Sequence, residues 1–185
     1  NNDIIPVKKQ IEKHINIHDS ISLNINFKDL KVRGTFVDYC IRKFLNKKSF
    51  GPLKYLNTTK EYFDYCTINN IKSDKELIKK VFSNDFYYLL KNKFFNLFKD
   101  LKTDIIIFNN NLNIFGEPDL ISNQSIIDIK IMDNLTSQTY IQLILFGLLS
   151  SKNNLYIYNP LTGILSEYII ENKYYKSLYG YLNNC

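Results

Sequence analysis

The sequence predicts an α/β protein in which helices flank a mixed central β-sheet. Apolar residues recur at three-to-four spacing in much of the first hundred residues, whereas short Ile-rich runs separated by polar turns follow. The resulting order of helix, three strands, helix and strand is typical of a sheet covered by helices. With 185 residues, 45% of them hydrophobic, the chain is long enough for one domain with its own core.

In the first hundred residues the elements follow from periodicity. Residues 7–15 have helical spacing, and residues 22–27 alternate like a short strand. An apolar stripe through residues 32–48 predicts a helix of about three turns. Residues 53–72 are weakly patterned, so we expect helix or irregular structure there, and residues 73–101 return to helical spacing.

Three strands are expected next, at residues 103–108, 112–121 and 126–131. Short polar stretches separate them, Asn-Asn-Asn at 109–111 and Ser-Asn-Gln-Ser at 122–125. Because such tight turns reverse the chain, we expect an antiparallel meander.

The chain then returns to helix. Thr136 or Ser137 is expected to cap it, because either side chain can accept a bond from the first helical N–H groups. The elements expected in this part are a helix at 136–150, strands at 154–159 and 164–170 joined by a Pro-Leu-Thr-Gly turn, and a helix at 172–182.

Charge is distributed unevenly along the chain. Residues 1–100 hold 19 Lys and Arg against 11 Asp and Glu, whereas residues 101–185 hold 5 against 7. A basic part beside a slightly acidic one suits a polyanion such as nucleic acid, with the acids free to hold metal ions. Abundant Asn, Ile, Lys and Tyr are also typical of an A/T-rich genome, which enriches lysine whatever the function.

Composition also limits the cellular compartment in which we expect the protein. No apolar run reaches the length of a membrane span and no apolar leader opens the chain, so we expect a soluble, intracellular protein without a membrane partner. Three cysteines without Cys-x-x-Cys spacing favour a reducing compartment. Because Met132 is the only methionine, we expect residues 1–185 to be a single domain cut from something longer.

His14 and His18 are four residues apart, and on a helix they would share a face that could bind a metal ion. The sequence offers no third His and no nearby Cys to complete a zinc site. An ordinary surface pair is therefore the preferred interpretation.

A charged pair interrupts the isoleucines of the strand expected at 126–131. Side chains alternate across a strand, so Asp128 and Lys130 share one face and the isoleucines that alternate with them share the other. Charges near a core are rarely kept unless they are paired, hydrated or used. Two interpretations are open: a cross-strand charge pair or a functional site.

Asp119 favours the second interpretation. The short turn between the strands places Asp119 near Asp128, where two carboxylates repel each other unless a cation joins them. Mg²⁺ and Mn²⁺ prefer oxygen ligands, and Glu117 is a reserve ligand on the same strand. Lys130 beside such an ion would orient or help to deprotonate an attacking water. Phosphodiester hydrolysis is the chemistry that this set fits best.

Two further motifs extend the pattern to a known family. Gly-Glu-Pro-Asp at residues 116–119, followed by Asp-Ile-Lys at 128–130, resembles the signature of the PD-(D/E)xK nucleases, in the RecB-like and lambda-exonuclease-like branch. That branch carries a glutamine on the next helix and often an aromatic residue one turn later, and Gln142 and Phe146 hold those positions here. Upstream, the stretch Arg-Gly-Thr-Phe-Val-Asp is similar to the family's glycine-led helix start, with Asp38 at the metal-binding place.

The resemblance, which covers residues 33–170, implies a restriction-endonuclease-like core (αβββαβ) and Mg²⁺ or Mn²⁺ as the cofactor. The metal ligands that it implies are Asp38, Asp119, Asp128 and the Ile129 carbonyl. Lys130 would position the attacking water, and Gln142 would hold the lysine or a DNA phosphate by hydrogen bonds. For Asp38 an ordinary alternative is an i,i+4 salt bridge with Arg42 on a solvated helix.

Contacts with nucleic acid are expected from basic residues near the site in sequence and from one aromatic residue that would stack on unpaired bases. These residues are Arg33, Arg42, Lys43 and Tyr140.

Together these observations predict a metal-dependent DNA nuclease, with a basic helical part to about residue 100 and a catalytic sheet and helix from about residue 101. The resemblance implies an exonuclease or strand-end processing enzyme of replication, recombination or repair that acts on single-stranded DNA or duplex ends. Two alternatives stay open: a structure-specific or RNA endonuclease of the same superfamily, and a nucleic-acid-binding module that has lost cleavage. A basic face that meets a protein or an anionic membrane is a third, and it predicts no salt-sensitive affinity for nucleic acid.

Overall fold

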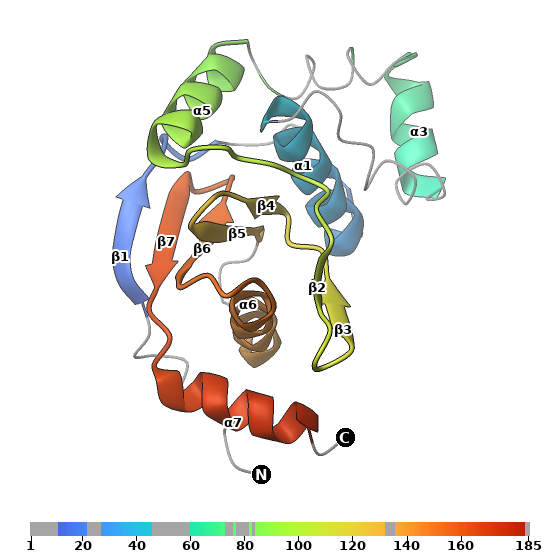
Figure 1. The fold of residues 1–185 in the computed structure, drawn as a ribbon. Coiled ribbons are helices and arrows are strands. Elements are labelled where there is room, and N and C mark those ends of the chain that lie inside the picture. The colour runs from blue at the N-terminus through green and yellow to red at the C-terminus, as the bar shows by residue number, and fades with distance from the viewer. Residues whose placement is uncertain are drawn as a thin grey trace.

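In the computed structural model the chain forms a five-stranded mixed sheet with helices on both faces (Figure 1). The structure describes residues 11–21, 27–45, 60–72, 76, 82, 84–131 and 136–183. Its elements are, in chain order, β1 (Ile11–Asn16), α1 (Leu30–Leu45), α3 (Lys60–Ile68), α5 (Asn84–Leu97), β2 (Ile107–Asn109), β3 (Ile114–Gly116), β4 (Leu120–Ile121), β5 (Ser125–Ile129), α6 (Ser137–Ser150), β6 (Asn154–Asn159), β7 (Ile164–Tyr168) and α7 (Asn172–Asn183). The predicted α/β class is confirmed. None of the described helices is long and apolar enough to cross a membrane.

The sheet has the strand order β1-β7-β6-β5-β4, in which β5 and β6 run parallel and the other neighbours antiparallel. A parallel pair needs a crossover connection, because a tight turn would reverse the chain. α6 makes this crossover between β5 and β6 (Figure 1). Of the two N-caps considered, Thr136 is the one observed, and its side chain accepts a hydrogen bond from the N–H of Thr139.

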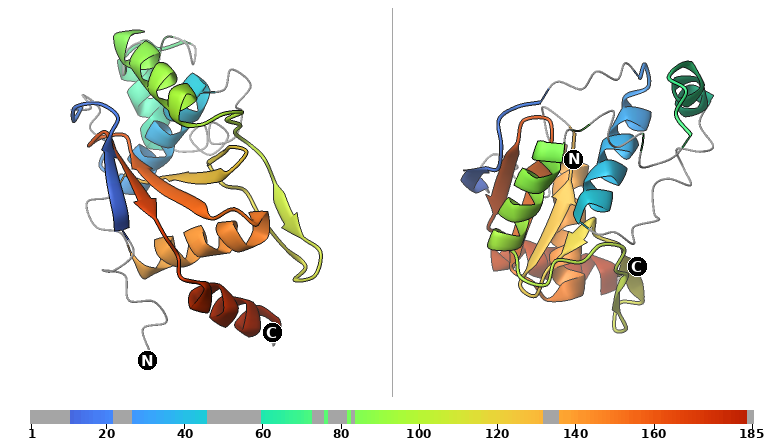
Figure 2. Two further views of the ribbon diagram at one scale, coloured as in Figure 1. Left: turned by 60° about the vertical axis from the view of Figure 1, so that its left-hand side comes forward. Right: turned by 90° about the horizontal axis from the view of Figure 1, so that it is seen from above.

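Two hydrophobic cores hold the helices on opposite faces of the sheet (Figure 2). On one face, Phe36 of α1 and Phe94 of α5 belong to the same core as Ile127. On the other face, Leu143 of α6 belongs to the core that contains Ile126. Successive residues of β5 thus enter different cores, and every residue of the strand is buried. A charged side chain in β5 is therefore enclosed whichever face it takes.

The N-terminal part differs from its prediction. Of residues 7–15, expected in a helix, residues 11–15 belong to β1, which pairs antiparallel with β7, and residues 7–10 lie outside the described residues. Pairing satisfies backbone groups along an edge of β7 that would otherwise be open, and this outweighs the local helical spacing. The basic part of the chain is therefore not wholly helical, because β1 belongs to the sheet.

The two histidines do not share a helix face. A ring nitrogen of His14 lies 2.9 Å from the hydroxyl of Ser166 on β7. His18 is buried beyond the end of β1, with one ring nitrogen 2.7 Å from the hydroxyl of Tyr158 and the other 2.6 Å from the carbonyl of Asp19. Each histidine has a separate structural role, and the metal-binding alternative does not fit this arrangement.

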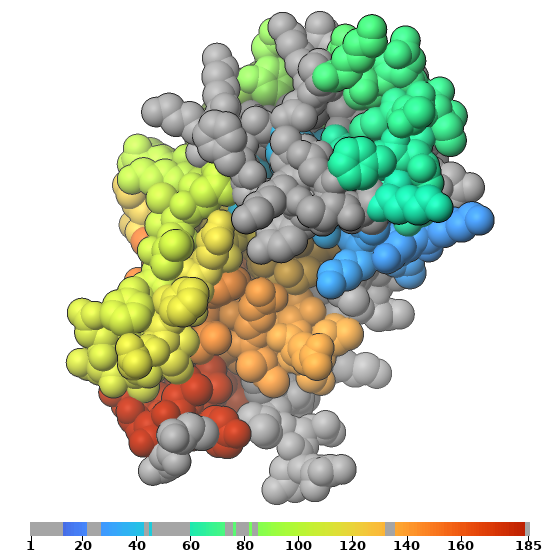
Figure 3. Space-filling view, turned by 90° about the vertical axis from the view of Figure 1, so that its right-hand side faces the viewer, coloured from blue at the N-terminus to red at the C-terminus, as the bar shows by residue number. Residues whose placement is uncertain are grey.

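The expected three-strand meander is divided between two sheets. Residues 112–121, predicted as one strand, form β3 and β4 with a bend at Glu117-Pro118-Asp119. β3 pairs with β2 in a separate two-stranded hairpin, while β4 joins β5 in the main sheet. Pro118 has no N–H to offer a ladder, which explains why the strand ends there. The hairpin lies beside α6 and stands out from the body (Figures 2 and 3).

The strand expected at 103–108 is shorter and shifted, since β2 begins at Ile107 and ends at Asn109, while the other predictions agree more closely where the structure describes them. The helix expected at 32–48 appears as α1, and the second part of the helix expected at 73–101 appears as α5. Most of the strand expected at 22–27 and most of residues 73–83 lie outside the described residues.

Gly116 lies where the hairpin meets α6, and we predict that it tolerates no side chain. A Cβ there would lie 2.8 Å from the ring of Phe146 and 3.3 Å from Leu149. Gly116→Ala should therefore lower the free energy of unfolding by about 1–3 kcal/mol, measured by urea denaturation. Gly180→Ala in α7 is the matched control, because nothing lies within 4 Å of its Cβ. Similar effects of the two substitutions would contradict the close packing.

Candidate active site

The site begins where β5 ends. Asp128 is the second-last residue of β5 and is 1% exposed. Lys130 follows the strand and donates its N–H to the carbonyl of Tyr158 at 3.0 Å, which extends the ladder with β6. Its Nζ lies 2.9 Å from Oδ2 of Asp128. The two charges therefore pair along one buried strand rather than across two strands.

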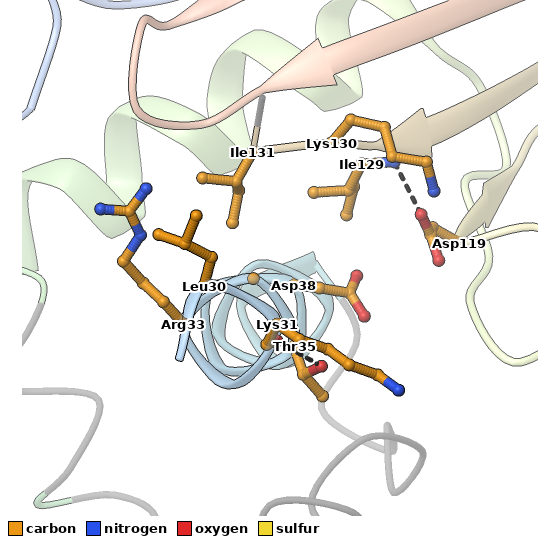
Figure 4. A pocket seen from close by; sticks show the side chains of 10 residues that line it. Leu30, Lys31, Arg33, Thr35, Asp38, Asp119, Ile129, Lys130 and Ile131 are labelled. Atoms are coloured by element: carbon orange, nitrogen blue, oxygen red, sulfur yellow. Dashed lines mark hydrogen bonds between the residues drawn. The ribbon is translucent and has the colours of Figure 1, made fainter. Parts of the chain in front are cut away.

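The register of β4 places Asp119 beside this pair. Leu120 lies opposite Ile127, so the residue before Leu120 reaches the level of Asp128. Oδ2 of Asp119 accepts a hydrogen bond of 2.6 Å from the N–H of Ile129 (Figure 4). The expected meeting of Asp119 and Asp128 is observed, and each lies close enough for their charges to interact.

α1 brings Asp38 to the same place. Its Oδ2 accepts hydrogen bonds from Nε and Nη2 of Arg42, one turn later, at 3.3 and 3.1 Å. Oδ1 of Asp38 is buried and accepts no hydrogen bond from the described residues. The i,i+4 pair considered as an alternative does form, but Arg42 is 8% exposed, so the pair is not on a solvated face.

Arg42 forms ion pairs with four carboxylates. Its Nη2 also lies 3.8 Å from Oδ1 of Asp119. Its Nη1 lies 3.2 Å from Oδ1 of Asp104 and 3.6 Å from Oε1 of Glu117. The planar guanidinium carries donors in a fixed fork that can face several acids together. Asp104 was not among the predicted site residues, because only the fold brings it close to α1.

The carboxylates carry more negative charge than the neighbouring cations balance. Burial and the charge of Asp119 raise the pKa of Asp38 to about 7 in spite of Arg42. Burial and Asp119 also raise the pKa of Asp128, against the effect of Lys130. Burial alone would lower the pKa of Lys130, but the charges of Asp128 and Asp119 outweigh it and raise the pKa. An added cation would relieve this repulsion.

A pocket of about 610 Å³ opens beside the cluster, between α1 and the chain after β5. The charged ends of Asp38, Asp119 and Lys130 turn toward one end of it (Figure 4). Arg33 and Leu30 lie at the other end (Figure 4). Asp128 lies beneath the lining residues, where it contacts Lys130.

The structure assembles most of the predicted catalytic and metal-binding residues. Those brought together are Asp38, Asp119, Asp128, Ile129 and Lys130. Gln142 does not join them, because it lies on an exposed face of α6 and does not line the pocket. Phe146, one turn later, is buried against Gly116.

The residues predicted to contact nucleic acid differ in whether they are accessible. Arg33 lines the pocket, and its Nε is buried without a hydrogen-bond partner among the described residues. Arg42 is enclosed by carboxylates, and Tyr140 is 3% exposed with its ring against Tyr168, so the structure corrects the expectation that these two are accessible. Tyr140 lies on the face of α6 that covers the sheet, which is the physical reason for its burial. The side chain of Lys43 lies outside the described part of the chain.

The carboxylates suit a metal ion in their chemistry, but the structure does not arrange them around one. Within the described ranges, no three His, Cys, Asp or Glu side chains are arranged to hold an ion. Nη2 of Arg42 lies within 4 Å of oxygens of both Asp38 and Asp119 and draws them to its own charge. The donor set nevertheless suits Mg²⁺, which takes one or two carboxylates and keeps several waters. The unpartnered Oδ1 of Asp38 is the clearest vacant donor.

Comparison with known proteins gives no relative. The chain matches no family model, and no curated protein or solved structure matches it significantly. Its function must therefore be inferred from the site itself.

The raised pKa of Asp38 predicts a pH-dependent stability. The folded chain holds this proton up to about pH 7, whereas the unfolded chain releases it near the ordinary value of 3.8. The free energy of unfolding should therefore fall as the pH rises through this window, by up to about 1.4 kcal/mol per pH unit. In urea denaturation at several pH values, the free energy of unfolding of Asp38→Asn should decline less steeply with pH than that of wild type. The decline that remains should be the contribution of Asp128.

Asp64→Asn, on the exposed side of α3, is the control and should keep the wild-type decline. If the free energy of unfolding of Asp38→Asn declined with pH as that of wild type does, the carboxyl with the raised pKa would not be Asp38.

Proposed function

We propose that this chain is a Mg²⁺- or Mn²⁺-dependent nuclease that hydrolyses phosphodiester bonds in DNA. The supporting observation is the convergence of Asp38, Asp119 and Asp128 on Lys130 at the edge of a pocket. Asp38 lies on α1, Asp119 just before β4 and Asp128 on β5, in the order of the PD-(D/E)xK signature. The parallel pair of β5 and β6 with α6 as its crossover supports the further proposal of a restriction-endonuclease-like core.

Asp38 and Asp119 line the pocket and would hold the ion, with Asp128 beneath them and the Ile129 carbonyl as further ligands. When bound, the ion supplies positive charge that stabilises the phosphate oxygens in the transition state.

Lys130 is the residue that would orient the attacking water. Its raised pKa keeps the ammonium charged near neutrality, so it donates hydrogen bonds rather than taking up a proton. Asp128 fixes the ammonium at 2.9 Å, and the N–H of Ile129 fixes the carboxylate of Asp119. Arg33, at the opposite end of the pocket, would bind a phosphate of the same strand. From its exposed position, Gln142 would contact the nucleic acid and not Lys130.

A second candidate is a nucleic-acid-binding module of the same fold that does not cleave. Arg42 favours it, because the guanidinium already gives Asp38 and Asp119 a positive neighbour where an active nuclease needs a metal ion. In this candidate Arg42 replaces the ion permanently.

Cleavage should require a divalent metal ion. With end-labelled single- and double-stranded DNA and an RNA of the same sequence, wild type should give products with Mg²⁺ or Mn²⁺ and none with EDTA. Lys130→Ala and Asp119→Asn should each lower the rate at least about 100-fold, since each removes a group that acts on the reacting atoms. Lys173→Ala, at an exposed lysine of α7, is the matched control. The product ladder distinguishes end-dependent from internal cutting, and equal cleavage by all variants would assign the activity to a contaminant.

Substitution of Arg42 separates the two candidates. In the absence of metal, Arg42→Met should lower the free energy of unfolding by about 3–5 kcal/mol, because it leaves buried carboxylates without their counter-charge. Mg²⁺ should raise the melting temperature of wild type, and it should raise that of Arg42→Met further. If Mg²⁺ left the melting temperature of wild type unchanged but raised that of Arg42→Met, the non-cleaving module would be favoured. Asp119→Asn should reduce the response in either background.

A further inference from the structure

The hairpin of β2 and β3 presents an aromatic surface to solvent. Phe108 and Phe115 lie directly opposite each other across the two strands and are 52% and 69% exposed. Ile106, just before β2, is 67% exposed. Large apolar side chains gathered on one projecting element usually mark a contact surface. Figure 3 shows the hairpin, in yellow-green and yellow, standing out from this side of the molecule.

The hairpin does not need this surface in order to fold. Its inner face packs on α6, where Ile105 and Ile107 adjoin the core of that helix and Gly116 meets Phe146. The outer face, which carries Phe108 and Phe115, is therefore free for another use.

The hairpin is joined at both ends to the candidate active site. Both ends of the hairpin lead to carboxylates that contact Arg42: Asp104 precedes β2 and Glu117 follows β3. Phe115 is two residues before Glu117, so in an extended chain the two side chains point to the same side, about 7 Å apart along the strand. A nucleic acid whose phosphate lies at Asp119 and Lys130 would pass close to Phe115.

The chemistry of the hairpin suits bases rather than phosphates. Residues 105–116 contain no charged side chain, and four of them are asparagines. Aromatic rings stack on any base, and amide groups can hydrogen-bond to base edges, whereas phosphates are attracted by cations. The two rings and Ile106 expose roughly 350 Å², well below the about 800 Å² that each partner contributes to a stable protein interface. Unpaired bases therefore fit this surface better than a protein does.

We propose that Phe108 and Phe115 form a stacking platform for unpaired bases of the DNA strand that enters the active site. The proposal rests on the nuclease function proposed above and names its substrate class: single-stranded DNA, or a duplex end with an unpaired strand. Recognition by stacking implies little preference for sequence.

The test compares two probes with equal numbers of phosphates, a fluorescein-labelled oligothymidylate and an abasic oligomer of the same length. Binding is measured by fluorescence anisotropy in EDTA, so that cleavage plays no part. The Phe108→Ala, Phe115→Ala double variant should bind oligothymidylate about 10- to 100-fold more weakly and the abasic oligomer as wild type does. Phe115→Trp should keep the affinity, whereas Phe115→Leu, which is apolar but not aromatic, should lose part of it.

Phe63→Ala is the matched control, because Phe63 is also 52% exposed but lies on α3, away from the hairpin (Figure 1). It should bind both probes as wild type does. The melting temperature of each variant shows that it has folded.

Three results would overturn the platform. The first is equal affinity of wild type and the double variant for oligothymidylate, and the second is an equal loss for the abasic oligomer. The third is a wild-type dimer that becomes a monomer in the double variant by light scattering, which would assign the surface to a second copy of the chain.

The cleavage assay distinguishes this failure from that of the nuclease proposal. If wild type cleaves DNA and the double variant binds normally, the platform alone is wrong. If wild type neither cleaves DNA nor binds either probe, the nuclease proposal and the platform are wrong together.

Discussion

The burial of like charges around Arg42 is the constraint on which the rest of this site depends. One guanidinium on α1 faces acids that precede β2, follow β3 and precede β4. It therefore connects a helix on one face of the sheet with two separate segments of the chain, the residues before β2 and the bend between β3 and β4. Ion pairs of this kind do not by themselves make a protein more stable than apolar packing would. Their effect is to make the positions of α1, the hairpin and β4 dependent on one another.

The irregular parts of the fold lie where this cluster is formed. Pro118 divides a strand in two and allows Asp119 to turn toward the N–H of Ile129. Asp104 has a φ of 56°, a left-handed conformation that Asp adopts more readily than most residues, and its carboxylate reaches Arg42. Natural sequences tend to break local rules at functional sites and to obey them elsewhere. Here two such breaks lie next to the same guanidinium.

The parts of the fold that were predictable from sequence are those decided by nearby residues. α1, α6 and the hairpin of β6 and β7 follow from strong periodicity and short turns, and the meeting of Asp119 with Asp128 follows from the short turn between β4 and β5. Apart from its i,i+4 pair with Asp38, the cluster of acids around Arg42 was not predictable, because Asp104, Glu117 and Asp119 reach it only through the tertiary fold. The burial of Tyr140 was missed for a related reason: α6 is apolar on most sides, so its sequence does not reveal which face covers the sheet.

The pairing of β1 with β7 has a consequence for how the molecule is made. His14 and Ser166, which lie opposite each other in this pair, are 152 residues apart in sequence. During synthesis β1 leaves the ribosome well before β7, and it has no partner until the 152 residues that separate His14 from Ser166 have followed. Contacts of such long range are slow to form, and unpaired strand edges are prone to misassembly while they wait. The edge of the sheet farthest from the candidate active site is thus completed late in folding, and a ribosome-bound intermediate would expose it for longest.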